Sequence, residues 1–392
     1  MSISPRFGFT YKLPDENVVI RGGAGLFAGR IPLVWPGGVY NNTGMSVGGV
    51  SLNSVAATTA ANLHFIADPY NQPTAQSLGI DLSNAKGQVD LIAKDFRLPK
   101  VFRASIAFDK RFDNGWSLSA EYIYTKNINE IYYQNLNILP PTLKVTGPDN
   151  RNTYAATGSA PFIPINSNGT NPYTGIYLMS NNKGNKGFAH NFSLSVNKSF
   201  RNGVNINASY AYGTSQVTYE GTSSQNSSQY NTLATVNGRN FTTRARSNFD
   251  LGHRLTAYVS KKFTYAKKSM ATTISLFYTG QSGDALTYVY SGSMIRDVST
   301  SNNQDLIYVP TTADIKNSVF IAASGLTPDQ QKAALEAFIS NDKYLNSRRG
   351  DYAERNGGRL PFTNVLDFSI KQDFNLKIGK QTYQLQVSYD IF

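Results

Sequence analysis

The chain contains no cysteine, carries few charged side chains, and has no long apolar run. The absence of cysteine among its 392 residues excludes disulfides and thiolate metal sites. No window approaches the roughly 18 consecutive apolar residues of a transmembrane helix. A transmembrane β-barrel escapes that hydropathy test because only alternate residues of each strand face lipid.

Signals for export, catalysis and nucleic-acid binding are also missing. Residues 1–5 lack a basic and an apolar region, so no signal peptide is recognisable. An exported barrel needs one, so either the chain is not such a barrel or it is the later part of a longer protein. The three histidines are far apart, and we find no nucleophile elbow and no nucleotide-binding loop, so we expect no metal site, no cofactor and no catalysis. The net charge of +12 is dispersed along the chain, which argues against a nucleic-acid partner.

Paired alternating strands are the main positive signal. Between residues 101 and 125, apolar side chains recur at alternate positions on both sides of the turn Asp113-Asn114-Gly115, with Lys110 as an exception. The opposite face is mostly polar, with Ala107 and Ile123 as exceptions. Similar pairs occupy residues 7–27, 192–212, 255–279 and 366–391, and the third of these four is predicted to turn near Tyr265.

Short and long connections alternate strictly along the chain. The short ones are polar turns, for example Arg201-Asn202-Gly203 and residues 377–380. The long ones are residues 30–100, 137–185, 218–248 and 290–360. This alternation is typical of barrels with tight periplasmic turns and extended extracellular loops. The aromatic residues next to the short turns predict an interfacial girdle, although strand-end packing in a soluble sandwich would also place them there: Phe112, Trp116, Phe200, Phe263, Tyr265, Phe374 and Tyr383.

One helix is predicted inside the last long loop. Thr327-Pro328-Asp329-Gln330 has the capping-box arrangement, with proline at the first helical position, and an apolar pattern follows. We therefore expect a short amphipathic helix on the rim of the barrel, with a structural role.

Distinctive motifs occupy residues 4–9 (Ser-Pro-Arg-Phe-Gly-Phe), 19–27, 30–35 and 349–362, and the last of them leads into residues 366–368 and 372–374. In these motifs, which span nearly the whole chain, the sequence resembles TonB-dependent outer-membrane receptors of the Oar-like kind, which are abundant in Bacteroidetes. The resemblance implies a Gram-negative outer-membrane location, a barrel of about 22 strands, an N-terminal plug domain and a segment that contacts the TonB complex. Residues 1–392 would then be the C-terminal part of the barrel: an all-β, antiparallel, partial transmembrane β-barrel of about ten strands.

The chain departs from that family at both ends. We find neither a plug nor a TonB-contact segment before Ser4. Phe392 is in phase with Asp390 and Ser388 rather than with the apolar positions Tyr389 and Ile391, so it lacks the pattern of a terminal assembly signal. These departures predict that the plug and at least one closing strand lie outside this chain.

Candidate contacts lie in the loops and on the polar strand faces. Arg348, Arg349, Glu354 and Arg355 belong to the densest charge group, for which fixing loop geometry is the first interpretation and ligand contact the second. Arg30 and Trp35, at the start of the first long loop, are further candidate contacts. Trp35 is either a substrate platform or a loop anchor. Arg103 lies on a polar strand face whose charges, including Asp109, Glu121 and Arg111, either meet a plug or passing solute or merely balance one another.

The sequence therefore predicts a segment of an outer-membrane TonB-dependent receptor that takes up a scarce solute. Its partners would be outer-membrane lipid, the missing plug and barrel strands, the TonB complex through the missing N-terminal part, and a solute that the fold does not identify. The alternatives are a structural or adhesive outer-membrane protein and a soluble secreted β-domain.

Overall fold

The computed structural model describes residues 3–14, 16–44, 65–74, 76–79, 87–155, 173–241, 243–298, 304–379 and 381–392. Parts of the four long connections, His64, and the turn positions Asp15 and Lys380 lie outside these ranges.

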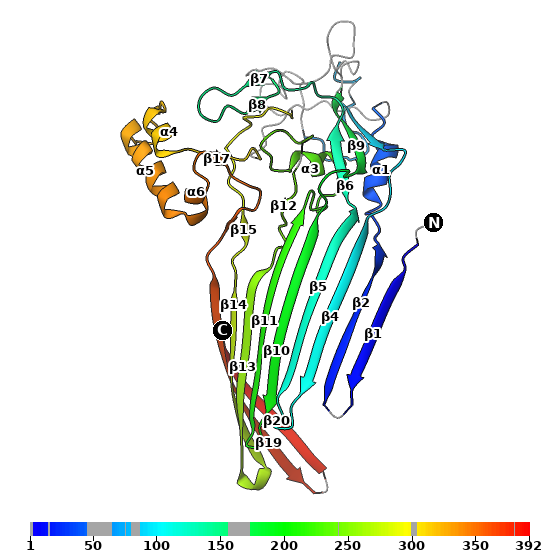
Figure 1. Ribbon diagram of the computed structural model, residues 1–392, viewed down its shortest axis with the longest axis vertical. Helices are drawn as coiled ribbons and strands as arrows, with labels where there is room; N and C mark the ends of the chain where they lie inside the picture. Colours follow the sequence, from blue (N-terminus) through cyan, green and yellow to red (C-terminus); the bar gives the residue numbers. More distant parts are fainter. Residues whose placement is uncertain are drawn as a thin grey trace.

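A single large antiparallel sheet dominates the molecule (Figure 1). Ten strands follow one another in chain order, and the short strand β12 (Ala245–Arg246) pairs with the end of β11. The ten are β1 (Arg6–Leu13), β2 (Val18–Ala28), β4 (Lys100–Arg111), β5 (Ser117–Asn129), β10 (Phe188–Ser199), β11 (Val204–Val217), β13 (Gly252–Tyr265), β14 (Met270–Gln281), β19 (Thr363–Ile378) and β20 (Gln381–Ile391). The prediction of about ten antiparallel strands is confirmed.

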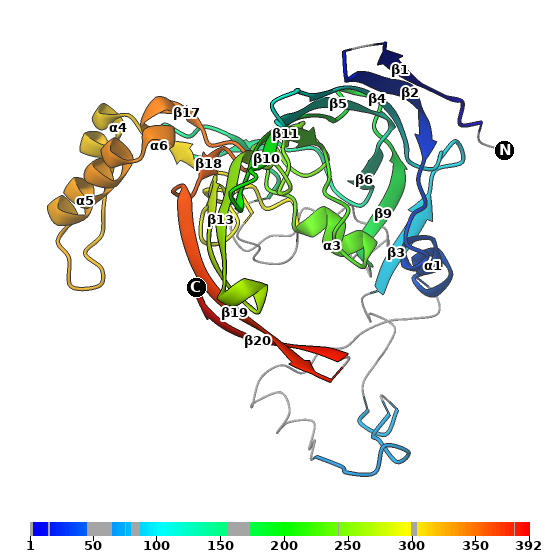
Figure 2. The same ribbon diagram turned by 90° about the horizontal axis from the view of Figure 1, so that it is seen from below.

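The sheet has one apolar face and one polar face, as the period-two pattern requires. Phe192 of β10 pairs with Tyr122 and Tyr212, and all three belong to the apolar face. The sheet is strongly curved when seen along its strands (Figure 2). The polar face forms the inner side of the curve: Ala107 and Ser260 on it are buried, whereas Ile106 on the apolar face is 54% exposed.

The described parts of the short turns lie close to where the sequence predicts them, except that β19 continues through Lys377 and Ile378, which the sequence placed in a turn. Gly115 and Gly203 have φ of +86° and +85°, conformations that glycine adopts without strain and that close the turns after β4 and β10. In the hairpin of β13 and β14, Tyr265 is the last strand residue, and the turn follows it as the short 3-10 helix η1 (Ala266–Lys268).

Gly23 of β2 allows its neighbour to approach closely. A Cβ atom there would lie 2.5 Å from the carbonyl oxygen of Phe7 in β1. The glycines of this stretch therefore allow neighbouring strands to pack closely.

The aromatic residues beside the short turns contact one another on the apolar face. The rings of Trp116 and Phe200 meet edge to face at 6.2 Å. The Lys198 ammonium lies over both rings, 5.3 and 4.5 Å from their centroids. Rings that offer an apolar body together with a cation suit the boundary between an apolar and an aqueous medium.

The long connections form a second assembly at the opposite end of the strands (Figure 1). Its largest part is a three-stranded sheet in which β9 (Tyr173–Asn181) pairs with β3 (Gly87–Ile92) in parallel and with β6 (Ile131–Asn135) in antiparallel fashion. Helices α1 (Val34–Asn41) and α3 (Asn226–Asn231) pack against it. Two-residue ribbons complete the assembly: β7 (Leu143–Lys144) with β8 (Asn152–Thr153), β15 (Ala285–Leu286) with β18 (Gly358–Arg359), and β16 (Tyr308–Val309) with β17 (Asp351–Tyr352).

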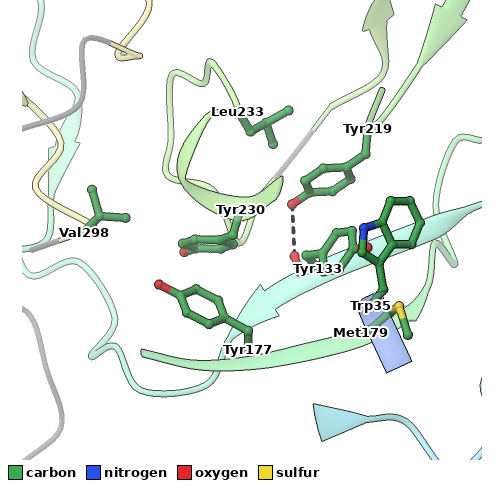
Figure 3. Packing of buried hydrophobic residues seen from close by; sticks show 8 residues of the cluster. All are labelled: Trp35, Tyr133, Tyr177, Met179, Tyr219, Tyr230, Leu233 and Val298. Carbon is green, nitrogen blue, oxygen red and sulfur yellow. Dashed lines mark hydrogen bonds between the residues drawn. The ribbon is translucent and has the colours of Figure 1, made fainter. Parts of the chain in front are cut away.

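The main hydrophobic cluster lies within this loop assembly (Figure 3). Its eight buried side chains are Trp35, Tyr133, Tyr177, Met179, Tyr219, Tyr230, Leu233 and Val298, drawn from four separate connections. Aromatic edges meet in it, for example Tyr133 and Tyr219 at 5.4 Å. The cluster therefore contributes to holding the long loops together.

The predicted helix is present as α5 (Pro328–Asn341). Its Thr327 capping box is formed in both directions, and Pro328 is at the first helical position. The sequence predicted one helix, and the described residues also contain α1, α3, α4 (Thr312–Asn317) and α6 (Lys343–Ser347). Helices α4 to α6 project on the outer side of the curve, where both views show them apart from the strands (Figures 1 and 2). Among the helices in the described ranges, none is long and apolar enough to span a lipid bilayer.

Candidate binding site: an arginine-lined cavity

A cavity of about 500 Å³ lies between the loop that follows β11 and the loop that precedes β19. Its charged lining consists of four arginines and two carboxylates: Arg244, Arg246, Arg348, Arg355, Asp351 and Glu354. The lining therefore carries two more positive than negative groups. This balance favours an anionic occupant.

Arg355 is the most constrained of these arginines. Its side chain reaches the end of β11, where Nη1 donates to the Thr218 carbonyl oxygen at 2.7 Å and Nη2 to the Val217 carbonyl oxygen at 2.5 Å. The residue is 8% exposed, and Nε has no hydrogen-bond partner among the described residues. Burial lowers the pKa of Arg355 because it removes water from the charged guanidinium.

Arg348 is engaged on its own loop. Its Nε and Nη2 donate to the Tyr352 carbonyl oxygen at 3.0 and 2.8 Å. The same guanidinium pairs with Asp351 at 2.7 Å and with Glu354 at 3.5 Å. Both carboxylates are more than half exposed, so solvent screens these pairs and their main effect is to orient the loop.

Arg246 joins the two loops that enclose the cavity. Its Nη1 donates to the carbonyl oxygens of Asn356 and Gly357, at 3.0 and 3.2 Å. Arg359 also comes from the second of these loops and forms an ion pair with Asp250, which follows the first. Burial and the neighbouring charge of Arg246 together lower the pKa of Arg359.

A buried ionic cluster lies beside the cavity. The Arg239 side chain is fully buried, pairs with Asp297, and lies 3.7 Å from Asp305. Asp305 also accepts hydrogen bonds from the main-chain nitrogens of Met294 and Ile295, at 2.5 and 2.7 Å. Burial raises the pKa of Asp297, and the Arg239 charge opposes that rise. This cluster fixes the loops that carry the cavity walls.

A second cavity of about 510 Å³ adjoins the first. The two share Leu233, Ala234, Arg355 and Asn356 in their linings. Arg355 and Asn356 therefore stand between them, and Asn356 Nδ2 donates to the Arg246 carbonyl oxygen at 2.8 Å and to Asn248 Oδ1 at 2.6 Å.

The predicted contact residues lie in different places. Arg348, Glu354 and Arg355 meet in the cavity, whereas Arg349 binds Glu336 of α5 at 2.6 Å. Trp35 is buried, and its Nε1 donates to the Ser223 carbonyl oxygen at 2.9 Å, which favours the loop anchor over the substrate platform. Arg30 is exposed.

On the inner face of the sheet, Arg103 donates to Thr125 at 3.2 Å and lies over the Phe27 ring. The sequence places Arg103 and Arg111 on the same strand faces as Asp109 and Glu121, but neither arginine forms an ion pair with these carboxylates in the described residues. Their partner is Arg21 of β2, at 3.0 and 3.2 Å.

Sequence reasoning missed Arg21, Arg244 and Arg246. The alternation Arg244-Ala245-Arg246 is a strand-like signal inside a polar loop, and β12 forms there. Pattern alone did not indicate that this ribbon faces residues 348–357, because the two segments are about a hundred positions apart in the chain.

The family to which the chain belongs follows from a comparison with known protein families. A model described as "Outer membrane beta barrel domain" matches residues 1–392. The chain belongs to this family. Its curved sheet is accordingly an outer-membrane β-barrel domain, its apolar outer face meets lipid, and its location is the bacterial outer membrane. Barrels of this kind are normally non-enzymatic.

Solved structures similar to the domain include the outer membrane transporter YddB from Escherichia coli, with 11% identity and a TM-score of 0.44 over 99% of this chain and 36% of that one. The FrpB iron transporter from Neisseria meningitidis (F3-3 variant) has 9% identity and a TM-score of 0.34, over 95% and 32%. The open form of the ferric-catecholate import receptor Fiu from E. coli K12 has 10% identity and a TM-score of 0.33, over 99% and 46%. The domain thus spans less than half the length of these structures. No curated protein sequence matches it.

Proposed function

We propose that this domain forms wall and extracellular loops of a TonB-dependent receptor that takes up a scarce anionic solute. The arginine-lined cavity carries the proposal, because its four arginines outnumber its two carboxylates and it lies among the loops that face the medium. Arginine presents a planar fork of donors suited to carboxylate, phosphate or sulfate.

The polar inner face of the sheet supports a transport path rather than a closed core. Arg21, Asp109 and Glu121 form a charged group on that face, and Ser119 donates to Asp109 at 2.5 Å. We propose that such groups contact the plug domain of the complete receptor, and that the TonB complex acts on that plug. The Oar-like assignment belongs to the same proposal. The domain itself performs no catalysis in this scheme.

Nutrient growth tests the proposal. A strain that lacks the gene is compared with its parent on limiting supplies of a panel of anionic and neutral nutrients, with and without a protonophore that removes the driving force for TonB. We expect the deletion strain to lose growth on one anionic nutrient and to lose its protonophore-sensitive uptake. Full uptake of every nutrient by the deletion strain would contradict the proposal.

Complementation with site variants links uptake to the cavity. A gene that carries Arg246→Gln with Arg348→Gln, both in the cavity lining, should restore protein level but raise the half-saturating nutrient concentration at least tenfold, through loss of two charge-assisted contacts. Lys332→Gln, on α5 and outside the cavity, is the control.

A surface-binding role is the second candidate. Residues between α4 and α5 favour it, because Val319 and Ile321 are 93% and 81% exposed on the outer side of the curve. Loss of attachment to surfaces in the deletion strain, with uptake intact, would select this role.

A further inference from the structure

A second basic cluster lies on the apolar, outer face of the sheet, at the end that carries the long loops. Lys126 near the end of β5 pairs in register with Phe188 at the start of β10. Arg244, which precedes β12, reaches the same place. Together with Tyr122, Tyr124 and His190, these residues line a shallow hollow of about 600 Å³.

Two cations converge in this hollow. Lys126 Nζ and Arg244 Nη1 both donate to the Lys186 carbonyl oxygen, at 2.9 and 3.4 Å. Both also lie over the Phe188 ring, 5.8 and 4.8 Å from its centroid. The aromatic ring and the carbonyl oxygen hold two positive charges side by side, a costly arrangement that an anion between them would relieve.

Compensating carboxylates are absent from the described surroundings. None of the residues that line the hollow is acidic. Within the described residues, the ion pairs include neither Lys126 nor Arg244, although they involve many other basic residues of this domain. Glu130 does not line the hollow, and its carboxylate is directed to the main-chain nitrogens of Gly187 and Thr218, at 2.9 and 2.8 Å.

The hollow also offers aromatic and polar groups at one level of the wall. The Tyr122 hydroxyl and His190 Nδ1 are 2.6 Å apart, and the Tyr124 and His190 rings are 5.0 Å apart. Below this level, the same face continues as apolar side chains such as Leu194 and Ala120, which pair in register. The cluster therefore lies where the hydrocarbon core ends and lipid headgroups begin.

We propose that Lys126 and Arg244 bind the phosphate of a lipid headgroup in the outer leaflet of the outer membrane. Phosphate oxygens would accept from the Lys126 ammonium and the Arg244 guanidinium, and the acyl chains would lie along the apolar face below. The site fixes the height and the rotation of the wall in the membrane. It depends on the membrane location of the domain and not on the uptake that we propose for the cavity.

Native mass spectrometry of the full-length protein in nanodiscs tests this site. The nanodiscs contain either a phosphorylated outer-leaflet glycolipid or the same glycolipid after phosphatase treatment, and the protein is released by activation in the gas phase. We expect the wild-type protein to retain the phosphorylated lipid, and Lys126→Gln with Arg244→Gln to lower that retention roughly 10- to 30-fold. Lys126→Arg with Arg244→Lys preserves the charges and should preserve retention.

The chain provides a closely matched control. Lys332 Nζ donates to the Lys316 carbonyl oxygen at 2.9 Å and lies 5.9 Å from the centroid of the Phe320 ring, almost the geometry of Lys126, but on helix α5. Lys332→Gln should leave lipid retention unchanged.

Equal retention of the phosphorylated and dephosphorylated glycolipids by the wild-type protein would overturn the proposal, and that comparison needs no variant. Displacement of the lipid by millimolar inorganic phosphate would identify a site for free phosphate instead, which also overturns it. Loss of retention in the Lys332 variant would show that the effect of charge is not local to the hollow.

Discussion

The curved sheet and the loop assembly satisfy their polar groups by different means. In the sheet, neighbouring strands pair the main chain in one continuous register, for example from Phe188 to Ser199 along β10. In the loop assembly, single side chains accept hydrogen bonds from main-chain groups that have no strand partner. Glu130 accepts from two main-chain nitrogens of other segments, and Asn135 Oδ1 accepts from the nitrogens of Asn137 and Ile176, at 3.0 and 3.2 Å.

This difference determines where each region is vulnerable. Pairing in the sheet is spread over many equivalent contacts, so the loss of one contact matters little. The sheet is sensitive instead to polar or charged substitutions on the face that meets lipid. Order in the loop assembly depends on a few buried polar residues whose partners lie far away in the chain. One substitution there leaves several main-chain groups without partners.

The largest effect is expected at Arg239, in the loop assembly. Arg239→Ala removes the only ion-pair partner of Asp297 among the described residues and leaves two buried carboxylates side by side. We expect a loss of about 3–5 kcal/mol in the stability of the loop assembly. Limited proteolysis of the full-length protein against denaturant measures it, with Arg201→Ala in an exposed turn as the control. Equal protection of the Arg239 and Arg201 variants would contradict the structural role of the cluster.

In the sheet, substitutions at two adjacent positions distinguish the lipid-facing side from the inner side. Leu194 and Ser195 are neighbours in the middle of β10, on the apolar and the polar face. Leu194→Arg should destabilise the inserted protein by roughly 2–4 kcal/mol, whereas Ser195→Arg should cost far less. Reversible folding into lipid vesicles gives both values. If the two variants behave alike, the assignment of the faces is wrong.

A smaller effect is expected from one hydroxyl in the hydrophobic cluster. The Tyr219 hydroxyl donates to the Tyr133 carbonyl oxygen at 3.0 Å (Figure 3). Tyr219→Phe keeps the ring and removes this bond, so we expect a loss of about 1–2 kcal/mol from the loop assembly. Proteolysis as above reports it. A variant as stable as the wild-type protein would show that the aromatic packing alone carries this contact.

The smallest effect is a response to acid at one helix end. The Thr311 hydroxyl donates to Asp314 at 2.7 Å, and this bond holds the pKa of Asp314 below its usual 3.8. A lowered pKa stabilises the folded form above pH 3.8, and that contribution is lost as pH falls through the folded value. Acidification below pH 3.8 should therefore lower the stability of the first turn of α4 by no more than about 1 kcal/mol.

Helix α5 supplies the comparison for that titration. Its capping box uses Gln330, which does not titrate, with Thr327. Hydrogen exchange by mass spectrometry across the acid range should show α4 losing protection while the first turn of α5 keeps it. Asp314→Asn should remove the acid response of α4.

The sequence predicted the sheet well because lipid on one side and polar surroundings on the other impose a period of two on every strand. The capping box at Thr327 could also be predicted from the sequence, because its signal lies within four residues. Helix α1 escaped prediction because Val34–Asn41 contains two glycines and a proline, and only its contact with the loop assembly forms it. The parallel pairing of β3 with β9 has no local signal.

The candidate site was predicted only in part, because only some of its residues are close together in the sequence. The charge group at Arg348, Glu354 and Arg355 is dense in the sequence, so it was visible. Its partners Arg244 and Arg246 belong to another loop and became apparent only through the fold. The pairing of Arg21 with Asp109 and Glu121 likewise depends on the neighbouring strand rather than on either strand of the hairpin.

The guanidinium of Arg355 links the arginine-lined cavity to the barrel wall. It holds the carbonyl oxygens of Val217, the last residue of β11, and of Thr218, while its Nε, which has no hydrogen-bond partner among the described residues, lies at the boundary of two cavities. An anion that draws this side chain toward itself must first release Val217 and Thr218, at a cost of about 1–3 kcal/mol for each buried acceptor left unpaired. Occupancy of the cavity by an anion would then loosen the end of β11 beneath it, so binding at this site would change the order of the barrel wall.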